Sequence, residues 1–121
     1  MANAQKRKGD AAEREAAQLI AALLELPARR KLGAGRTNGA GGDTGDIEGV
    51  PGHVIQIASW ANVAAAARLK PAEAQQQACN AALPFAASWV RFRGGTWRIV
   101  LTPEQWAAYD RCVLLCGHND A

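Results

Sequence analysis

The stretch GDIEGVPGHVIQIASW, residues 45–60, decides both the fold and the chemistry that this chain predicts. A strand over residues 46–50, a turn at Pro51-Gly52 and a second strand over residues 53–59 form the expected hairpin. The second strand holds Gln56 within a β-branched run, and a buried amide without a partner costs about 1–3 kcal/mol. An aspartate that opens one strand and a side-chain oxygen on the next can hold a hard divalent cation. The stretch therefore predicts a metal site.

The register of this hairpin decides which side chains meet. Side chains two apart on a strand share a face, so Asp46 lies with Glu48, and Gln56 lies with Ala58. A strict two-residue turn would set Asp46 opposite Ile57 and turn Gln56 away. We therefore expect a three-residue connection or a bulge, which brings both pairs to one face. The sequence leaves open whether Glu48 joins the metal site.

Length and composition indicate one globular domain. The chain has 121 residues, of which 49% are hydrophobic, and this suits a single domain with a modest core. No run is apolar enough to span a membrane, and the charged start lacks the apolar segment of a secretory signal. Three cysteines without a framework spacing predict reduced thiols and a cytoplasmic location, in the host cytoplasm for a viral protein. A zinc site at Cys112, Cys116 and His118 lacks a fourth ligand, so buried thiols are the preferred interpretation.

The net charge of +3 is unevenly distributed along the chain. Residues 1–36 contain eight Lys and Arg against four Asp and Glu, whereas the remaining residues contain six against seven. On charge alone, a polyanion partner and an ordinary solvated surface explain this distribution about equally well. The residues that would contact a nucleic acid are Lys6, Arg7, Lys8, Arg29, Arg30, Lys31 and Arg36.

The first expected helix covers residues 10–24 and follows a mobile basic arm of residues 1–9. At about 100° per residue, Glu13 lies toward the core side of the apolar stripe and Glu15 toward its flank. A carboxylate near an apolar face needs a partner or a metal. By itself, an acid that complements the helix dipole is the simpler explanation of Glu13. The stripe consists of Ala16, Leu19, Ile20, Leu23 and Leu24.

Periodicity and turn signals predict the remaining elements. A glycine-rich loop precedes the hairpin, an irregular or partly helical crossover follows it, and a second hairpin turns at Gly94-Gly95. Thr102, Pro103 and Gln105 have the spacing of a helix start. The order of elements predicts an α/β fold, a small mixed β-sheet flanked by helices, in one domain over residues 10–116 with a tail over residues 117–121. The expected ranges are a strand at 29–32, the loop at 33–45, the crossover at 60–70, a helix at 71–83 and strands at 87–93 and 96–101.

Three blocks of this sequence, in order, resemble the archaeal-type Holliday junction resolvases of the nuclease superfamily with the PD-(D/E)xK motif. KGDAAERE at residues 8–15 is similar to the family's KGxxAERE, and GDI with Gly49 is similar to its DI/LVAG block. VIQIAS at residues 54–59 stands where the family has IEVKS, and the late TWRI strand also fits. The resemblance covers roughly residues 6–106 and implies a restriction-endonuclease-like core.

The resemblance also implies a role for each matched position. Glu13 matches the helix acid of the active site, and Asp46 matches the central metal ligand. Gln56 replaces the second ligand, usually Glu, and Ile57 stands where a backbone carbonyl completes the coordination. Ala58 occupies the place of the catalytic lysine, and one such electrostatic contact is typically worth about 10²–10³ in rate. The implied cofactor is Mg²⁺, with Mn²⁺ as a substitute.

The function implied by the resemblance is a homodimeric, structure-selective endonuclease that resolves four-way or other branched DNA by metal-dependent hydrolysis, inactivated here by Ala58. An engineered change, or a natural loss that leaves a non-catalytic branched-DNA-binding module, would each explain Ala58. A third explanation is a base that has moved into the role, with Lys31, Arg36 and Lys70 as candidates. The intact Glu13 and Asp46 favour the engineered change. The dimer interface is expected on the helix after Pro71 or on the sheet edge that bears Trp89.

Overall fold

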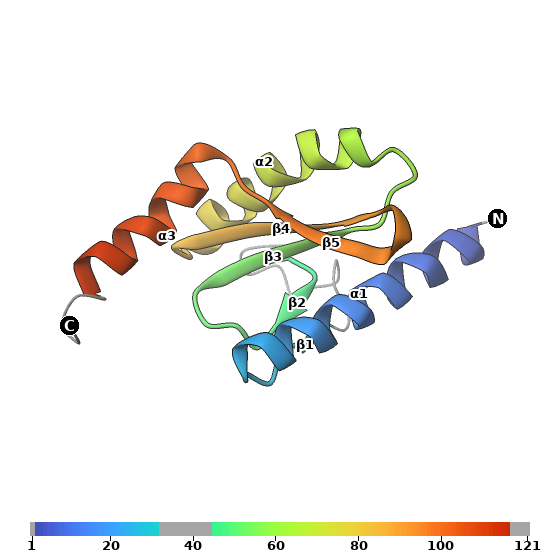
Figure 1. The fold of residues 1–121 in the computed structure, drawn as a ribbon, viewed down its shortest axis with the longest axis horizontal. Helices are drawn as coiled ribbons and strands as arrows, with labels where there is room; N and C mark the ends of the chain where they lie inside the picture. Colours follow the sequence, from blue (N-terminus) through green and yellow to red (C-terminus); the bar gives the residue numbers. More distant parts are fainter. Residues whose placement is uncertain (1, 32–44, 117–121) are drawn as a thin grey trace.

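The computed structural model describes residues 2–31 and 45–116, with the side chains of residues 2–8 and 116 left out. Nearly all of the expected glycine-rich loop, including Arg36, and the expected tail over residues 117–121 lie outside the described residues. Figure 1 shows the elements that are described. In chain order they are α1 (Ala2–Leu24), β1 (Arg29–Arg30), β2 (Ile47–Glu48), β3 (His53–Ala58), α2 (Val63–Ala81), β4 (Phe85–Phe92), a 3₁₀ turn (Arg93–Gly95), β5 (Thr96–Val100) and α3 (Pro103–Cys116).

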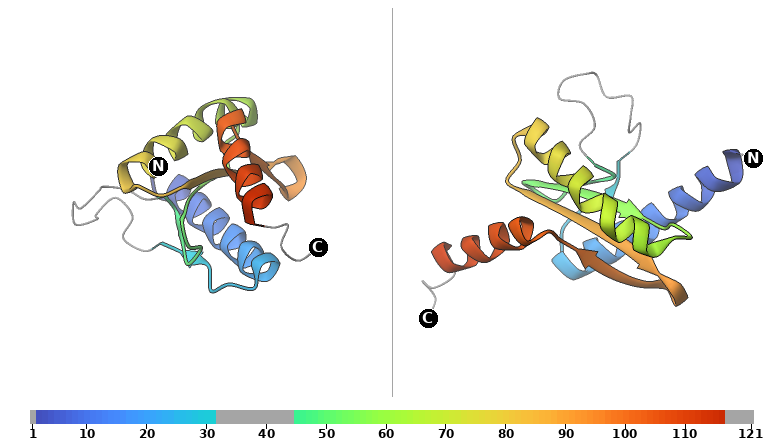
Figure 2. Two further views of the ribbon diagram at one scale, coloured as in Figure 1. Left: turned by 90° about the vertical axis from the view of Figure 1, so that its left-hand side faces the viewer. Right: turned by 90° about the horizontal axis from the view of Figure 1, so that it is seen from above.

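The centre of the molecule is a mixed sheet in the order β3-β4-β5. β3 runs parallel to β4, and β4 runs antiparallel to β5. α1 and α2 cover opposite faces of this sheet, while β1 and β2 form a separate antiparallel pair (Figures 1 and 2). The expected α/β class, a small mixed sheet flanked by helices, is therefore confirmed.

Alternation along β3 explains why both faces are covered. Ile55 and Ile57 pack with Ala16 and Ile20 of α1. Val54, on the other face, packs with small residues of α2, which let the helix approach the sheet closely. All of these side chains are buried, so β3 contributes to the core on both faces of the sheet.

α1 differs from the expected helix in its start and in its buried face. It begins at Ala2, not at Asp10, because residues 2–8 are good helix formers and Gly9 costs only about 1 kcal/mol within a helix. The side chains that α1 buries most fully include Ala12, Ala16 and Ile20. The predicted stripe was wrong at its leucines, since Leu19 is 37% exposed and Leu23 is 65% exposed.

α2 begins eight residues before the position that the sequence indicated. The predicted start at Pro71 was wrong, because Asn62 caps the helix by accepting a hydrogen bond from the Ala65 backbone N–H at 3.0 Å. Pro71 lies buried inside α2. The alanines after Val63 favour helix strongly enough to carry the chain past Pro71.

The hairpin expected over residues 46–59 is only partly formed. β2 pairs with β1, with Arg29 opposite Glu48, and β3 takes β4 as its parallel neighbour. Asp46 still lies beside β3, because its backbone N–H donates to the Ile55 carbonyl at 2.8 Å. The four residues 49–52 connect β2 to β3, so the connection is longer than a two-residue turn.

The second half of the chain follows its local signals closely. Gly94 and Gly95 have φ of 77° and 79° in the turn between β4 and β5, a region that glycine adopts without strain. Thr102 and Gln105 exchange hydrogen bonds at the start of α3, as a capping box does.

Among the described helices, none has the length and apolar character needed to cross a bilayer.

Candidate functional site

Asp46 lies at the edge of β3. Its Oδ2 accepts a hydrogen bond from the Ile57 backbone N–H at 2.8 Å, and its own N–H donates to the Ile55 carbonyl. These two bonds fix the aspartate beside the middle of β3, although 11 residues separate Asp46 from Ile57. The structure therefore brings two of the predicted ligand positions, Asp46 and Ile57, into direct contact.

Glu13 lies across a small cavity from the same strand. Glu13 and Ile57 line this cavity of about 410 Å³, together with Ser59, Trp60 and residues of α1. We call it the Glu13 cavity. The Glu13 carboxylate already has a partner, because Arg30 Nε lies 3.0 Å from its Oε1. Glu13 can thus bind a ligand in the cavity only if its carboxylate contacts Arg30 and the ligand at once, or if its ion pair with Arg30 breaks.

Arg30 is held by two carboxylates. Its guanidinium also lies 3.0 Å from Asp10, so both acids of this part of α1 are neutralised by one cation. The hydrogen bond that Arg30 donates to Glu13, with a smaller contribution from the charge of Asp10, raises the pKa of Arg30 above its usual range. The pair was not predicted from the sequence, where Arg30 was assigned to a polyanion.

Gln56 points to the other helix. Its Nε2 donates to Gln77 Oε1 at 2.5 Å, and its Oε1 accepts from Lys70 Nζ at 3.3 Å. Both partners lie on α2, whereas Glu13 lies on α1. The predicted meeting of Gln56 with the Asp46–Glu48 face is therefore not seen. The buried amide does have partners, as the cost of an unpaired one requires.

Lys70 is the residue of this region to which the sequence gave least weight. Its side chain is only 14% exposed, and its ammonium contacts Gln56, Glu73 at 3.0 Å and the Trp60 ring at 5.5 Å from the centroid. These polar and aromatic partners offset the cost of placing an ammonium group where little water reaches it. Sequence reasoning placed Lys70 in an irregular crossover, and recognising Asn62 as a helix cap was the signal that could have placed it on α2.

Ala58 shares the face of β3 that α2 covers. It is 1% exposed and packs with Ala66 and Val90. In the same layer, Ser88 stands opposite Gln56 in the β3–β4 ladder, and its buried hydroxyl has no hydrogen-bond partner among the described residues. The cationic group on this face is Lys70, which approaches from α2 and not from β3.

The predicted ligands therefore divide between two places. Asp46 meets Ile57 at the edge of β3, Ile57 and Glu13 of α1 line the Glu13 cavity, and Gln56 lies with Lys70 beneath α2. Two carboxylates with a backbone carbonyl are hard oxygen donors of the kind that Mg²⁺ accepts, since it keeps most of its waters. Within the part of the chain that the structure describes, no three His, Cys, Asp or Glu side chains form a metal-binding group. The donor set fits a weakly held cation at most.

Some of the predicted nucleic-acid contacts are occupied by acids. Arg29 pairs with Glu48, which gives Glu48 a cation as a partner, and Arg30 pairs with Glu13. The Lys31 side chain is partly buried, and its backbone N–H donates to the Asp46 carbonyl. Arg36 and the side chains of Lys6, Arg7 and Lys8 lie outside what the structure describes.

The cysteines take no part in this region. Cys79 and Cys112 are free and exposed, so the expectation of a buried thiol was wrong for Cys112.

Comparisons of the chain with protein-family models, curated proteins and solved structures found no significant match.

Proposed function

We propose that this chain is a structure-selective endonuclease for four-way or other branched DNA, on a restriction-endonuclease-like core, in a form that no longer hydrolyses its substrate. The observation that carries the proposal is the contact between Asp46 and Ile57 next to the cavity that Glu13 lines. Asp46 contacts Ile57, and Ile57 lines one cavity with Glu13, which supports the assignment of these three positions to metal binding. The mixed sheet with helices on both faces is consistent with the proposed core.

The bound cation would be Mg²⁺ or Mn²⁺, held by Asp46, Glu13 and the Ile57 carbonyl. When bound, it polarises the scissile phosphate and lowers the pKa of a coordinated water. The residues of this chain do the remaining work: Asp46 stays fixed by the Ile57 N–H, and Arg30 keeps Glu13 oriented. Gln56 adds no charge, so the affinity for the cation is lower than a third carboxylate would give.

The loss of hydrolysis follows from the two substitutions on the α2 face. Ala58 cannot orient water or stabilise negative charge, and Gln56 is neutral. Of the three explanations for Ala58, a natural loss has the most support: Lys70 brings an ammonium to within 3.3 Å of Gln56 Oε1, but beside a neutral amide it does not replace the missing lysine. The close packing of Ala58 with Ala66 and Val90 also favours a natural residue over an engineered one.

Junction binding and cleavage by a small set of variants test this proposal. We expect the wild-type chain to bind a four-way junction more tightly than a linear duplex of the same sequence, without cleavage in Mg²⁺ or Mn²⁺. The double variant Gln56→Glu with Ala58→Lys should cleave the junction at a rate at least about 100-fold above the detection limit of the assay, below which wild type stays, since one electrostatic contact is worth about 10²–10³ in rate. Adding Asp46→Asn should abolish this activity.

Two controls keep this test decisive. The first control is thermal unfolding of each variant, which shows whether a lysine is tolerated at the buried position 58. The second is Gln56→Glu alone, which leaves Ala58 unchanged and places a carboxylate beside Lys70. Junction binding without any cleavage by Gln56→Glu or by the double variant would favour the second candidate, a non-catalytic branched-DNA-binding module. Equal affinity for junction and duplex would contradict both candidates.

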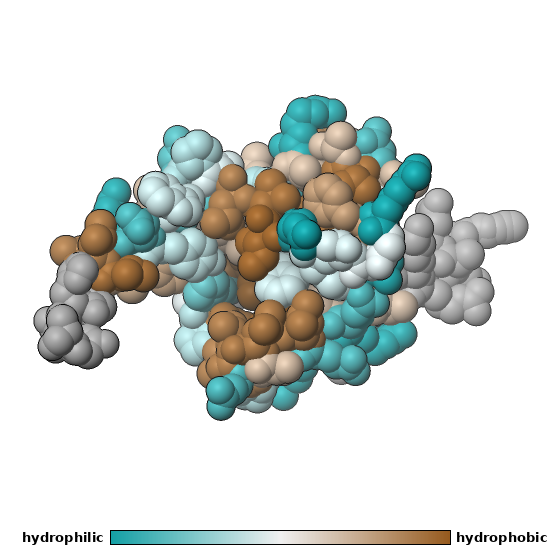
Figure 3. All heavy atoms as spheres, viewed as in Figure 1, coloured by the Kyte–Doolittle hydropathy of each residue, from teal (hydrophilic) through white to brown (hydrophobic). Residues whose placement is uncertain are grey.

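We propose further that the chain acts as a homodimer whose interface is the hydrophobic surface formed by α1, β5 and α3. Figure 3 shows hydrophobic atoms gathered over the end of α1 and over β5. A cavity of about 370 Å³ lies between them, lined almost entirely by apolar side chains. α3 projects from the sheet (Figure 2), and Val113, Leu114 and Leu115 on it are each more than half exposed. A two-fold axis would place the α3 of each copy against this cavity of the other.

A further inference from the structure

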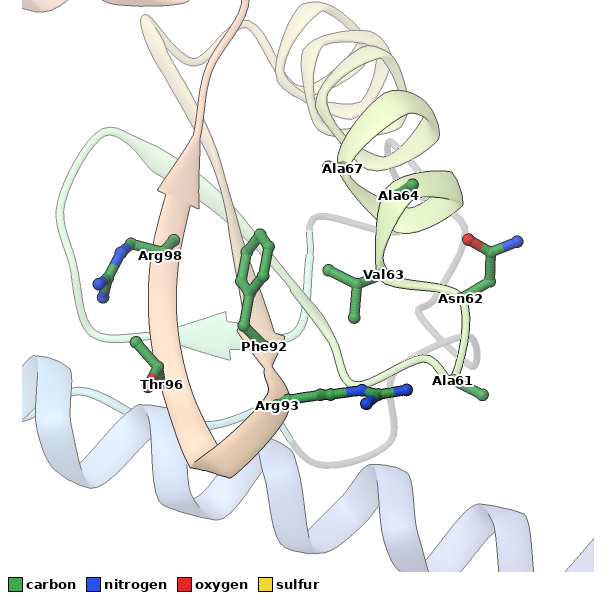
Figure 4. A pocket seen from close by; sticks show the side chains of 9 residues that line it. All are labelled: Ala61, Asn62, Val63, Ala64, Ala67, Phe92, Arg93, Thr96 and Arg98. Carbon is green, nitrogen blue, oxygen red and sulfur yellow. The ribbon is translucent and has the colours of Figure 1, made fainter.

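A long groove separates the start of α2 from the β4–β5 hairpin (Figure 4). Its volume is about 1110 Å³. It lies on the face of the sheet that faces α2, because Phe92, Thr96 and Arg98 continue the alternation of the buried Val90. We call it the Arg93 groove. The residues that line it are Ala61, Asn62, Val63, Ala64, Ala67, Phe92, Arg93, Thr96 and Arg98, and none of them is acidic.

The groove carries positive charge that the described residues do not neutralise. The Arg93 side chain extends from the turn toward the start of α2 (Figure 4). Arg98 lies on the outer rim, where its Nη1 donates to the Trp97 carbonyl. Unlike Arg29, Arg30 and Arg91, neither has a carboxylate partner within the described ranges. The first turn of α2 holds no acid either, so a polyanion meets no like charge here.

The floor of the groove is apolar and partly aromatic. The Phe92 ring points into the space between β5 and α2 and is 36% exposed (Figure 4). The α2 side presents Val63, Ala64 and Ala67. An exposed ring beside cations is the combination that binds single-stranded nucleic acid, because bases stack on the ring while phosphates meet the charges. A free inorganic anion would leave this apolar floor without a function.

The Arg93 groove adjoins the Glu13 cavity at the end of β3, although the two lie on opposite faces of the sheet. Ala61 lines both spaces, and Trp60, which is 38% exposed, lines the cavity directly before it. A strand that enters along Arg93 would pass around the end of β3 at Ala61 to reach the cavity beside Ile57. The volume also exceeds the roughly 300–1,000 Å³ that small-molecule pockets occupy, which favours an extended ligand.

We propose that the Arg93 groove binds an unpaired segment of a DNA strand, with phosphates at Arg93 and Arg98 and a base on Phe92, and directs that segment toward the Glu13 cavity. Branched DNA offers such splayed nucleotides where its arms meet. The identity of the polyanion rests on the proposed function, whereas the charge, the aromatic floor and the path are properties of this groove alone.

Binding of a fluorescent oligothymidylate at several salt concentrations tests the groove directly. Arg93→Ala with Arg98→Ala should weaken binding on the order of tenfold and reduce the log–log salt slope by about 1.4, since each phosphate contact on a single strand contributes about 0.7. Phe92→Ala should weaken binding on the order of tenfold with the slope unchanged, because stacking is not an ionic contact. Arg111→Ala, an exposed arginine of α3 outside the groove, is the matched control and should change neither.

The same variants are titrated against a four-way junction and a linear duplex, with thermal unfolding as the check on folding. If the slope for the double arginine variant equals that for Arg111→Ala, the groove assignment is overturned, while a junction preference in wild type leaves the proposed function standing. If oligothymidylate binding responds as expected but junction and duplex bind equally, the groove stands and the proposed function falls. No binding of any DNA overturns both.

Discussion

At the scale of single residues, the proposed site combines acids with neutral side chains. Asp46 contacts Ile57 and Glu13 lines the cavity beside it, whereas a neutral amide stands at Gln56 and a methyl group at Ala58. The structure adds Lys70, whose ammonium reaches the same face of β3 from the neighbouring helix. In the sequence, Gln56 and Ala58 look like the loss of a carboxylate and a lysine. In the structure, Gln56 belongs to a polar network with Gln77 and Lys70.

Tyr109 makes the free energy of unfolding depend on pH in the alkaline range. The ring stacks on Phe85 at 4.8 Å, and burial raises its pKa to about 12, against an ordinary value of 10. The folded state disfavours the phenolate, so this contribution is complete below pH 10 and is lost as the pH rises from 10 toward 12. We expect the free energy of unfolding to fall over that interval in wild type and to fall less in Tyr109→Phe.

The measurement is clean because the chain contains a single tyrosine. Near-ultraviolet absorbance should show one phenol titrating near pH 12 in the folded protein and near pH 10 in denaturant. A folded-state midpoint at the ordinary tyrosine value would show that the ring is not buried as described.

At the scale of elements, local signals decided where β4, β5 and α3 begin and end. The Gly94-Gly95 turn and the capping box of Thr102 and Gln105 act within a few residues, so the sequence predicts them well. The start of α2 was missed because Pro71 is a strong local signal for a helix start. The fixed cap at Asn62 and the alanines that follow it outweigh that signal.

Gln105 joins two helices and should matter more than its place in a cap suggests. It is 2% exposed, its Oε1 accepts from the Thr102 N–H, and its Nε2 donates to the Pro71 carbonyl of α2 at 2.8 Å. Gln105→Ala removes both bonds and should lower the free energy of unfolding by about 1–3 kcal/mol. Urea unfolding measures the loss. Gln76→Ala, an exposed glutamine of α2, is the control and should cost little; equal effects would contradict the bridging role.

At the scale of the whole molecule, the exposed hydrophobic surface predicts assembly. Leu23 is 65% exposed and Leu115 is 76% exposed, on two helices that border the same apolar cavity. Surfaces of this kind on a monomer mark interaction sites, and a stable interface covers roughly 800 Å² on each partner. We expect the wild-type chain to sediment as a dimer at micromolar concentration, and Leu23→Lys with Leu115→Lys to sediment as a monomer.

The control for this prediction is Leu69→Lys. Leu69 is 45% exposed on α2, away from the proposed interface, so its substitution should leave the dimer intact. Because all three leucines are exposed, circular dichroism of each variant should match that of wild type. A monomeric wild type would rule out this interface.

The sequence alone determined the α/β class, the second hairpin, the start of α3 and the positions of the candidate acids, because those depend on side-chain alternation and on contacts within a few residues. Only the tertiary structure decided that Gln56 turns toward α2, that Arg30 holds Glu13, and that Ala61 lines both the Arg93 groove and the Glu13 cavity. Lys70 is 14 residues from Gln56, and Arg30 is 17 residues from Glu13. Contacts over such separations depend on how the elements pack against one another, and no local pattern carries that information.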